Sequence, residues 1–151
     1  MNMKNRKVNE FTLQVKDIAD ATNVSTDAVR FYTKKGLLKP ERNKLNNYQM
    51  YNYADLLRLR FITKAKILGY TLNEIKQITQ ASENKETPCP LVRNIIEKRI
   101  KKNKKKFEEA MALQKRMEKA LRQWEQMDDA LPIGDSICHL IEKVTQGKDY
   151  E

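Results

Sequence analysis

The chain has 151 residues, of which 40% are apolar and 33% charged, and its formal net charge is +10. Four glycines and four prolines leave little material for the turns of an all-β protein. No run of 18 apolar residues exists, the N-terminus lacks an apolar signal-peptide core, and two cysteines are too few for a disulfide scaffold. We therefore expect a mainly α-helical, cytoplasmic protein with no membrane contact.

The basic residues are concentrated in the first half. Residues 1–80 contain 15 Lys and Arg against 7 Asp and Glu, whereas residues 81–151 contain 15 against 13. An excess of basic residues in the N-terminal half favours a polyanionic partner such as nucleic acid. The alternative is a protein that is only well solvated.

Residues 15–38 predict two short helices joined by a tight turn. An apolar stripe that starts at Val15 breaks at Thr22-Asn23, and Ser25 is a suitable N-cap for a second helix that ends at Gly36. This is the pattern of a helix-turn-helix, with an ordinary helical hairpin as the alternative. The second helix favours the DNA-binding interpretation because its polar surface carries Thr26, Arg30, Lys34 and Lys35.

Residues 41–53 predict a two-stranded wing, since Asn46 and Asn47 can adopt the positive φ of a hairpin turn. Residues 54–68 then predict a helix with an apolar inner face. Thr71 and Glu74 form a capping box for the helix that follows.

Residues 90–129 predict one long helix. Apolar residues recur there at spacings near three, four and seven, and the helix would be about 60 Å long. We expect it to pair with its own copy in an antiparallel or parallel coiled coil, because the first 80 residues cannot cover so long a stripe. The basic run at 98–106 is interpreted as a solvated helix face, with a second DNA contact as the alternative. Residues 136–146 predict a short terminal helix.

Four segments, in this order and spacing, resemble the MerR family of bacterial transcription regulators over nearly the whole chain. They are DAVRFY with GLL (27–32 and 36–38), NYQMY (47–51), RLRFI (58–62) and AKILGYTLNEI (65–75). The wing departs from the family, which usually has Gly-Tyr-Arg where this chain has Asn47-Tyr48-Gln49. The departure removes one charged contact to DNA.

The resemblance implies a homodimer bound to double-stranded, palindromic promoter DNA with an overlong spacer. An effector would make the dimer bend and untwist the spacer, and RNA polymerase would be reached only through the promoter. The resemblance also implies these DNA-binding residues: Ser25, Thr26, Arg30 and Tyr32 on the recognition helix, and Arg42, Asn47, Tyr48, Lys66 and Tyr70 around the wing. For each tyrosine, packing in the core is the alternative.

The fold class that we expect is mainly α, with a winged helix-turn-helix domain, a long dimerisation helix and a short C-terminal helix. The expected divisions are the DNA-binding domain at 11–80, a linker at 81–89, an antiparallel coiled-coil helix at 90–130, and an effector loop with the C-terminal tail at 131–151.

Cys89 begins the long helix, whereas Cys138 and the only histidine, His139, follow its far end. In an antiparallel dimer the two ends of different chains meet, so Cys89 could meet Cys138 of the partner. This arrangement resembles the metal-sensing branch of the family, and the Cys at the head of the helix resembles sensors of divalent ions. We expect a zinc-like ion on Cys89, Cys138 and His139, with a carboxylate of Asp128 or Asp129 as a further candidate.

The metal-sensing branch normally has another Cys at the end of the long helix, where this chain has Gln126, Met127, Asp128 and Asp129. The incomplete thiolate set disfavours mercury or lead as effector. Two alternatives stay open: a redox sensor that uses the same thiols, and an organic effector with structural cysteines. An adaptor with a silent helix-turn-helix is a further non-enzyme alternative. No catalytic motif accompanies Cys138 and His139, so we expect no enzyme.

Overall fold

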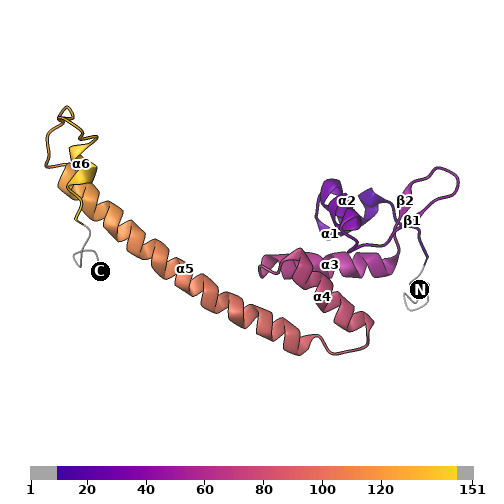
Figure 1. Ribbon diagram of the computed structural model, residues 1–151. Coiled ribbons are helices and arrows are strands. Elements are labelled where there is room, and N and C mark those ends of the chain that lie inside the picture. Colours follow the sequence, from indigo (N-terminus) through magenta and orange to yellow (C-terminus); the bar gives the residue numbers. More distant parts are fainter. Residues whose placement is uncertain (1–9, 146–151) are drawn as a thin grey trace. The chain divides into compact units, whose positions relative to one another are not determined.

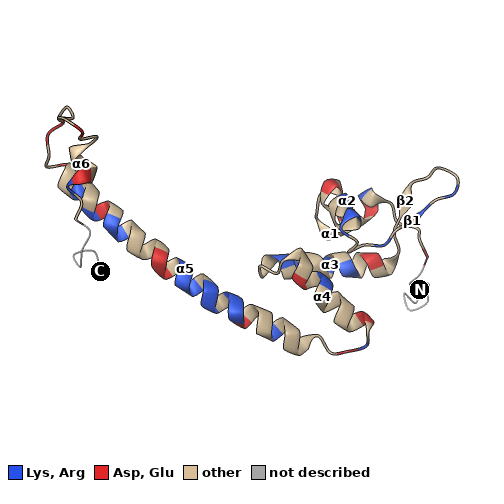
Figure 2. Cartoon of the chain, in the orientation of Figure 1, with Lys and Arg blue, Asp and Glu red and all other residues tan. Residues whose placement is uncertain are grey.

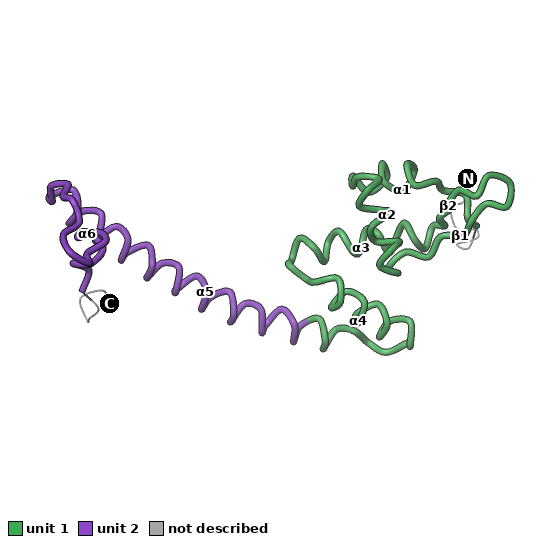
Figure 3. Tube along the Cα trace, turned by 45° about the horizontal axis from the view of Figure 1, so that its top comes forward, with its two compact units in different colours: residues 1–92 green, residues 93–151 purple. Residues whose placement is uncertain are grey.

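The computed structural model describes residues 10–145, which belong to two compact units that divide between Val92 and Arg93 (Figure 3). The described residues form helices and one small sheet (Figure 1). The expected fold class, mainly α with a winged helix-turn-helix and one long helix, is confirmed. Within the described part of the chain, no helix combines the length and the apolar character that a membrane span requires.

The helix-turn-helix consists of α1 (Val15–Thr22) and α2 (Thr26–Lys34). Asn23 ends α1 in the left-handed conformation, with φ of 56°. The Ser25 hydroxyl then accepts a hydrogen bond of 3.0 Å from the Ala28 backbone N–H, which satisfies one open donor at the start of α2. These two residues set the turn between the helices.

The wing is an antiparallel pair of strands, β1 (Glu41–Arg42) and β2 (Gln49–Met50), in which Arg42 pairs with Gln49. Of the two residues that the sequence offered for a positive φ in the hairpin turn, Asn47 adopts it, at 60°, and Asn46 does not. Directly after β2, Tyr51 forms an isolated bridge to Leu13, and this bridge attaches the segment before α1 to the wing.

Helices α3 (Tyr53–Ile67) and α4 (Leu72–Glu83) complete the first unit. The predicted capping box of Thr71 and Glu74 is present at the start of α4. A second capping box, of Asn52 and Asp55, starts α3. The buried Asp55 carboxylate also accepts a hydrogen bond of 3.1 Å from the Lys39 backbone N–H, so it fixes the segment between α2 and the wing.

The core of the first unit collects apolar side chains from all four helices, the wing and the loops between them. Tyr51 is fully buried although it carries a hydroxyl. The other largest fully buried side chains are Ile18, Val29, Leu37, Leu38, Leu59, Ile62 and Ile75. This core holds α1, α2 and the wing in one fixed arrangement.

The long helix α5 runs from Cys89 to Trp124, and its 36 residues give a length of about 54 Å. It ends five residues before the predicted end at 129. Gln126 and Met127 donate to carbonyls only three residues back, as in a tightening last turn. Two aspartates follow at 128 and 129, where the negative helix end disfavours anions.

The last helix, α6, spans His139–Glu142 and is shorter than the 136–146 that we predicted, of which residue 146 lies outside the described residues. Its start is displaced because the Glu142 carboxylate accepts hydrogen bonds from the backbone N–H groups of Ile137 and Cys138. These two residues are thereby held in a loop.

Candidate nucleic-acid interface and effector cysteines

The polar face of α2 carries the predicted recognition residues. The Arg30 guanidinium lies 3.3 Å from the Asp27 carboxylate and 3.5 Å from the Thr26 hydroxyl. Both partners of the ion pair are exposed, so water screens it and it contributes little to stability. Arg30 can therefore exchange this contact for a phosphate or a base edge at small cost.

A concave surface of about 490 Å³ lies between the start of α1, α2 and the wing. Five of the nine predicted DNA-binding residues line it: Thr26, Arg30, Arg42, Asn47 and Tyr48. Lys16 adds a third cation, and the Arg42 guanidinium donates a hydrogen bond of 3.1 Å to the Asn47 carbonyl. We call this surface, with its three cations, the wing groove.

The other four predicted residues lie outside the wing groove. Ser25 is the exposed N-cap of α2, and the half-buried Tyr32 ring lies 5.8 Å from the Phe31 ring. Lys66 is exposed near the end of α3. Tyr70 is 4% exposed, and its hydroxyl donates a hydrogen bond of 2.8 Å to the Val92 carbonyl in the first turn of α5. Tyr70 thus has a packing role in the structure, and a DNA contact for it stays a prediction.

Tyr51 fixes α2 relative to the wing. Its hydroxyl lies 2.7 Å from the Thr33 hydroxyl on α2, and Thr33 in turn donates to the Val29 carbonyl. Because Thr33 has only one hydroxyl proton, Tyr51 is the donor in this pair. Burial raises the pKa of the Tyr51 hydroxyl above its ordinary value of 10.0. A neutral phenol directly after β2 thus keeps α2 and the wing in a fixed arrangement.

Sequence reasoning missed three polar residues of the wing groove: Gln14, Lys16 and Gln49. Gln14 is the N-cap of α1 and Lys16 lies in its first turn, so both point to an interface only once α1 is placed beside the wing. A usable signal was present, because Lys16 lies on the polar side of the α1 stripe that contains Ile18 and Ala19.

The two cysteines are free thiols: Cys89 is the first residue of α5, and Cys138 lies 14 residues beyond its last residue, Trp124. Cys89 is exposed, and its backbone N–H donates to the Thr87 hydroxyl at 3.4 Å. Cys138 is half-buried and immediately precedes α6. Among the described residues of one chain, no group of three or more His, Cys, Asp and Glu side chains could hold a metal ion.

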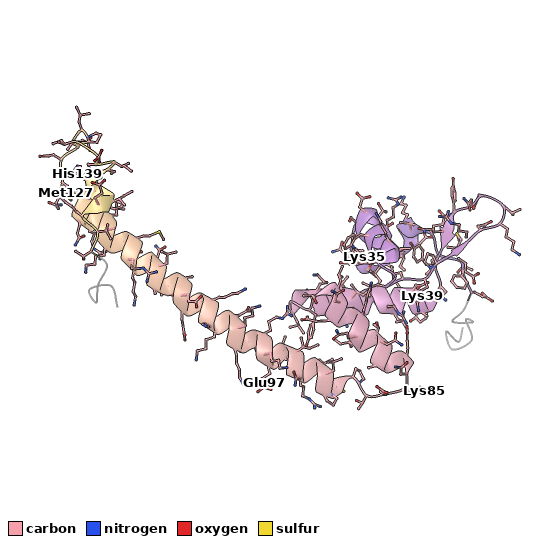
Figure 4. All side chains as sticks on the ribbon, viewed as in Figure 1. Lys35, Lys39, Lys85, Glu97, Met127 and His139 are labelled. Carbon is pink, nitrogen blue, oxygen red and sulfur yellow. The ribbon has the colours of Figure 1, made fainter. Side chains whose placement is uncertain are left out.

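The segment that carries Cys138 is attached to the end of α5. The Trp124 indole N–H donates a hydrogen bond of 2.9 Å to the Leu140 carbonyl. Figure 4 labels Met127 and His139 at this same end. The Glu142 carboxylate also accepts a hydrogen bond of 2.6 Å from the Ser136 hydroxyl. Hydrogen bonds from Ser136, and from the backbone of Ile137 and Cys138, lower the pKa of Glu142.

A second concave surface, of about 480 Å³, lies between α3 and α4. Leu57, Phe61 and Ile78 supply its apolar walls, and the ion pair of Arg58 with Glu83, at 2.8 Å, supplies its charge. Apolar walls with a few polar groups are typical of sites for small organic molecules.

Two family models match the chain. The model described as MerR HTH family regulatory protein matches residues 13–82, and the model described as MerR, DNA binding matches residues 56–120. Together they cover the helix-turn-helix, the wing, α3, α4 and most of α5.

Curated relatives cover much of the same range. The chain is 30% identical over 112 residues to a probable heavy metal-dependent transcriptional regulator of Haemophilus influenzae, covering 74% of this chain and 84% of that protein. It is 23% identical over 107 residues to the HTH-type transcriptional regulator ZntR of Escherichia coli K12, covering 70% and 76%. The mercuric resistance operon regulatory protein of Bacillus cereus is 34% identical over 77 residues, which cover 50% of this chain and 58% of that protein.

Among solved structures, the transcription regulator PbrR691 from Ralstonia metallidurans in complex with lead(II) superposes with a TM-score of 0.68. It is 24% identical and covers 87% of this chain and 98% of that chain, which shows a shared fold.

The fold, the wing groove and these matches define a winged helix-turn-helix protein of the class that binds DNA. The chain belongs to the MerR family of transcription regulators. The resemblance noted in the sequence is thereby confirmed, and so is the expectation that the protein is a regulator and not an enzyme.

Proposed function

We propose that the chain acts as a homodimer that binds a palindromic promoter through two wing grooves. It activates transcription by distorting an overlong spacer when an effector binds. The observation that carries the DNA-binding part is the wing groove, which brings Arg30 of α2 and Arg42 of the wing to one surface. Cations placed on two elements with fixed spacing can contact phosphates and set the register on the duplex.

The proposed effector is a divalent, zinc-like metal ion held between the two chains. Thiolates of Cys89 and Cys138 with the His139 imidazole are a suitable donor set for tetrahedral zinc, and a carboxylate or water could complete it. Cys89 lies at the opposite end of α5 from Cys138, so these donors would come from different chains of an antiparallel dimer. The names of the relatives, which include a heavy metal-dependent regulator, support a metal effector. When bound, the ion would supply a bond between the protomers and so couple their relative position to the bound DNA.

A metal titration on the reduced, purified dimer tests the effector. Zinc, cadmium, cobalt and copper(I) are added while free thiols are counted, and we expect zinc-like ions to bind at one ion per site. Cys89→Ser and Cys138→Ser should each abolish metal binding and induction while leaving promoter binding intact. Ile141→Ser is the matched control, because residue 141 is an exposed α6 neighbour and both thiols remain. Full induction in either cysteine variant would contradict a thiol-based effector site.

The second candidate is a redox sensor, and the exposed free thiol of Cys89 favours it. The same experiment separates the two candidates. Reversible loss of thiols under mild oxidant, without metal binding, would select the redox function. Neither response would leave an organic effector, for which the concave surface between α3 and α4 offers room.

A further inference from the structure

The long helix carries a regular stripe of side chains that is largely exposed in the described chain. From Ile96 to Leu121, the residues of this stripe recur at alternating steps of four and three, which is a heptad pattern. Ile100, Phe107, Met117 and Leu121 belong to this stripe and are between 52% and 66% exposed. We call the stripe the α5 seam. A heptad stripe on one helix packs against a heptad stripe on another helix, so a second copy of the chain is a suitable partner for the α5 seam.

Two seam positions are amides where the heptad favours apolar side chains. They are Asn103 and Gln114, and both are exposed in the single chain. The Gln114 amide nitrogen donates a hydrogen bond of 2.8 Å to Glu118, so its carbonyl oxygen can still accept from another amide. A polar group buried against apolar side chains is destabilising unless it finds a hydrogen-bonding partner, and such a residue can specify the register of a coiled coil.

We propose that Asn103 of one protomer pairs with Gln114 of the partner subunit, and that this pair fixes an antiparallel register of the dimer. This inference rests on the homodimer proposed above. In this register Phe107 faces the small Ala110 of the partner subunit, and Ile100 faces Met117 of the partner subunit. Ile96 faces Leu121 of the partner subunit. Each layer between Ile96 and Leu121 then pairs amide with amide, or apolar with apolar.

Other antiparallel registers lack this match. Sliding one helix by a heptad places Asn103 against Leu121 of the partner subunit and Gln114 against Ala110. Sliding it the other way places Asn103 against Phe107 of the partner subunit and Gln114 against Ile96. Both slides bury the two amides against apolar side chains, which leaves their hydrogen-bonding groups unsatisfied.

The charge distribution selects the antiparallel orientation over the parallel one. Residues 98–106 contain seven cations and no anion, and they crowd the first half of α5 (Figure 2). In a parallel dimer the two basic runs would lie side by side. In the proposed register residues 98–106 lie beside residues 111–119, which contain three cations and the anion Glu118. Repulsion between the helices is therefore smaller. In the same register Cys89 lies beside residue 128 of the partner subunit along the axis of the helix pair. The partner's segment that carries Cys138 follows residue 128 in the sequence.

Two spin labels measure the register. In a Cys89→Ser and Cys138→Ser background, one variant carries a label at Lys98→Cys and the other at Lys105→Cys. Both positions lie on the outer face of α5, opposite the seam, so the lateral part of the label-to-label distance is the same in both. At 1.5 Å per residue, the proposed register gives axial separations of about 32 Å for residue 98 and about 10 Å for residue 105.

Each alternative gives a different pair of distances. A slide by one heptad in one direction gives axial separations of about 42 Å for residue 98 and about 21 Å for residue 105. A slide in the other direction gives about 21 Å for residue 98 and nearly zero for residue 105. A parallel dimer gives the same distance at both positions. Any of these results would overturn the register while leaving the proposed homodimer standing. A monomeric mass by light scattering would overturn both.

A second variant tests the role of the amides. Asn103→Leu with Gln114→Leu should keep the dimer but broaden the distance distribution into several registers. The matched control is Asn94→Leu with Gln123→Leu, which makes the same changes at exposed positions outside the seam. A single, unchanged register in the seam variant would show that the two amides do not specify it.

Discussion

Removal of the Tyr51 hydroxyl tests whether this residue holds the recognition helix against the wing. Tyr51→Phe deletes a buried hydroxyl that donates at 2.7 Å to Thr33, and it creates no cavity beyond the lost oxygen. A neutral hydrogen bond contributes about 0.5–1.5 kcal/mol net, so we expect a loss of about 1 kcal/mol in the free energy of unfolding. For a cooperative unit of this size, that loss lowers the Tm by about 4–8 °C.

Thr33→Val removes the other partner of the same hydrogen bond. It removes the acceptor and leaves the buried Tyr51 hydroxyl with only the Gln49 side-chain carbonyl at 3.5 Å. An unsatisfied buried hydroxyl costs about 1–3 kcal/mol, so this variant should be the less stable of the two. The double variant should lose less than the two single losses added together, because both remove the same bond.

The assay is urea unfolding, monitored by circular dichroism at neutral and at alkaline pH. It compares the unchanged protein, Tyr51→Phe, Thr33→Val and the double variant. Burial raises the folded-state pKa of Tyr51, so its contribution is fully present below pH 10.0 and is lost as the pH rises through the folded-state value. Tyr51→Phe should lack this part of the alkaline destabilisation. Two results would refute the proposed bond. In one, the loss of unfolding free energy in the double variant equals the sum of the two single losses. In the other, the stability of Tyr51→Phe falls with rising alkaline pH as steeply as that of the unchanged protein.

Three further predictions concern the wing groove and the cysteine loop. Arg30→Ala should weaken promoter binding by about 1–3 kcal/mol in a titration followed by fluorescence anisotropy, and should reduce the slope of log K against log salt by about 1 if Arg30 contacts a phosphate. Asn47→Ala should destabilise the wing by about 1–2 kcal/mol in thermal unfolding, because φ is 60° there, whereas Asn47→Gly should not. Glu142→Gln should speed alkylation of Cys138 at neutral pH severalfold, since the carboxylate accepts the hydrogen bonds that hold the loop. In the unchanged protein the same loosening should appear as the pH falls below 4.5 and through the lowered pKa of Glu142.

The controls for these predictions change charge or size elsewhere. Lys76→Ala removes a cation from the exposed face of α4, and equal weakening of promoter binding by it would show that Arg30 acts only through net charge. Glu125→Gln removes a carboxylate near the end of α5. Faster alkylation of Cys138 in that variant too would mean that general electrostatics, and not the loop hydrogen bonds, protect the thiol.

Local chemistry made much of the fold predictable. Ser25 as an N-cap, Asn47 as a turn residue and Thr71 with Glu74 as a capping box each depend on groups within a few residues, and the structure contains all three. The features that sequence reasoning missed depend on contacts across the chain. The displaced start of α6 requires the side chain of Glu142. The sequence left Tyr70 between DNA contact and core packing, and its packing requires the Val92 carbonyl, 22 residues away.

The candidate site divides in the same way. Thr26 and Arg30 follow from the polar face of one helix, which periodicity reveals. Gln14 and Lys16 could not be assigned to the wing groove, because the bridge between Leu13 and Tyr51 that brings α1 beside the wing has no local signature.

The first turn of α5 belongs to the same compact unit as the DNA-binding elements, and the hydrogen bond from Tyr70 to Val92 attaches it there. A straight helix of about 54 Å that rotates by one degree about this attachment displaces its far end by about 0.9 Å. Metal–ligand bonds tolerate errors of only about 0.2 Å. If a metal ion joins the start of one α5 to the segment beyond the end of another, an error of that size at the ion corresponds to a rotation of α5 about its attachment of about 0.2 degrees. A helix of this length therefore relates a small displacement at its far end to a very small change of angle at its first turn.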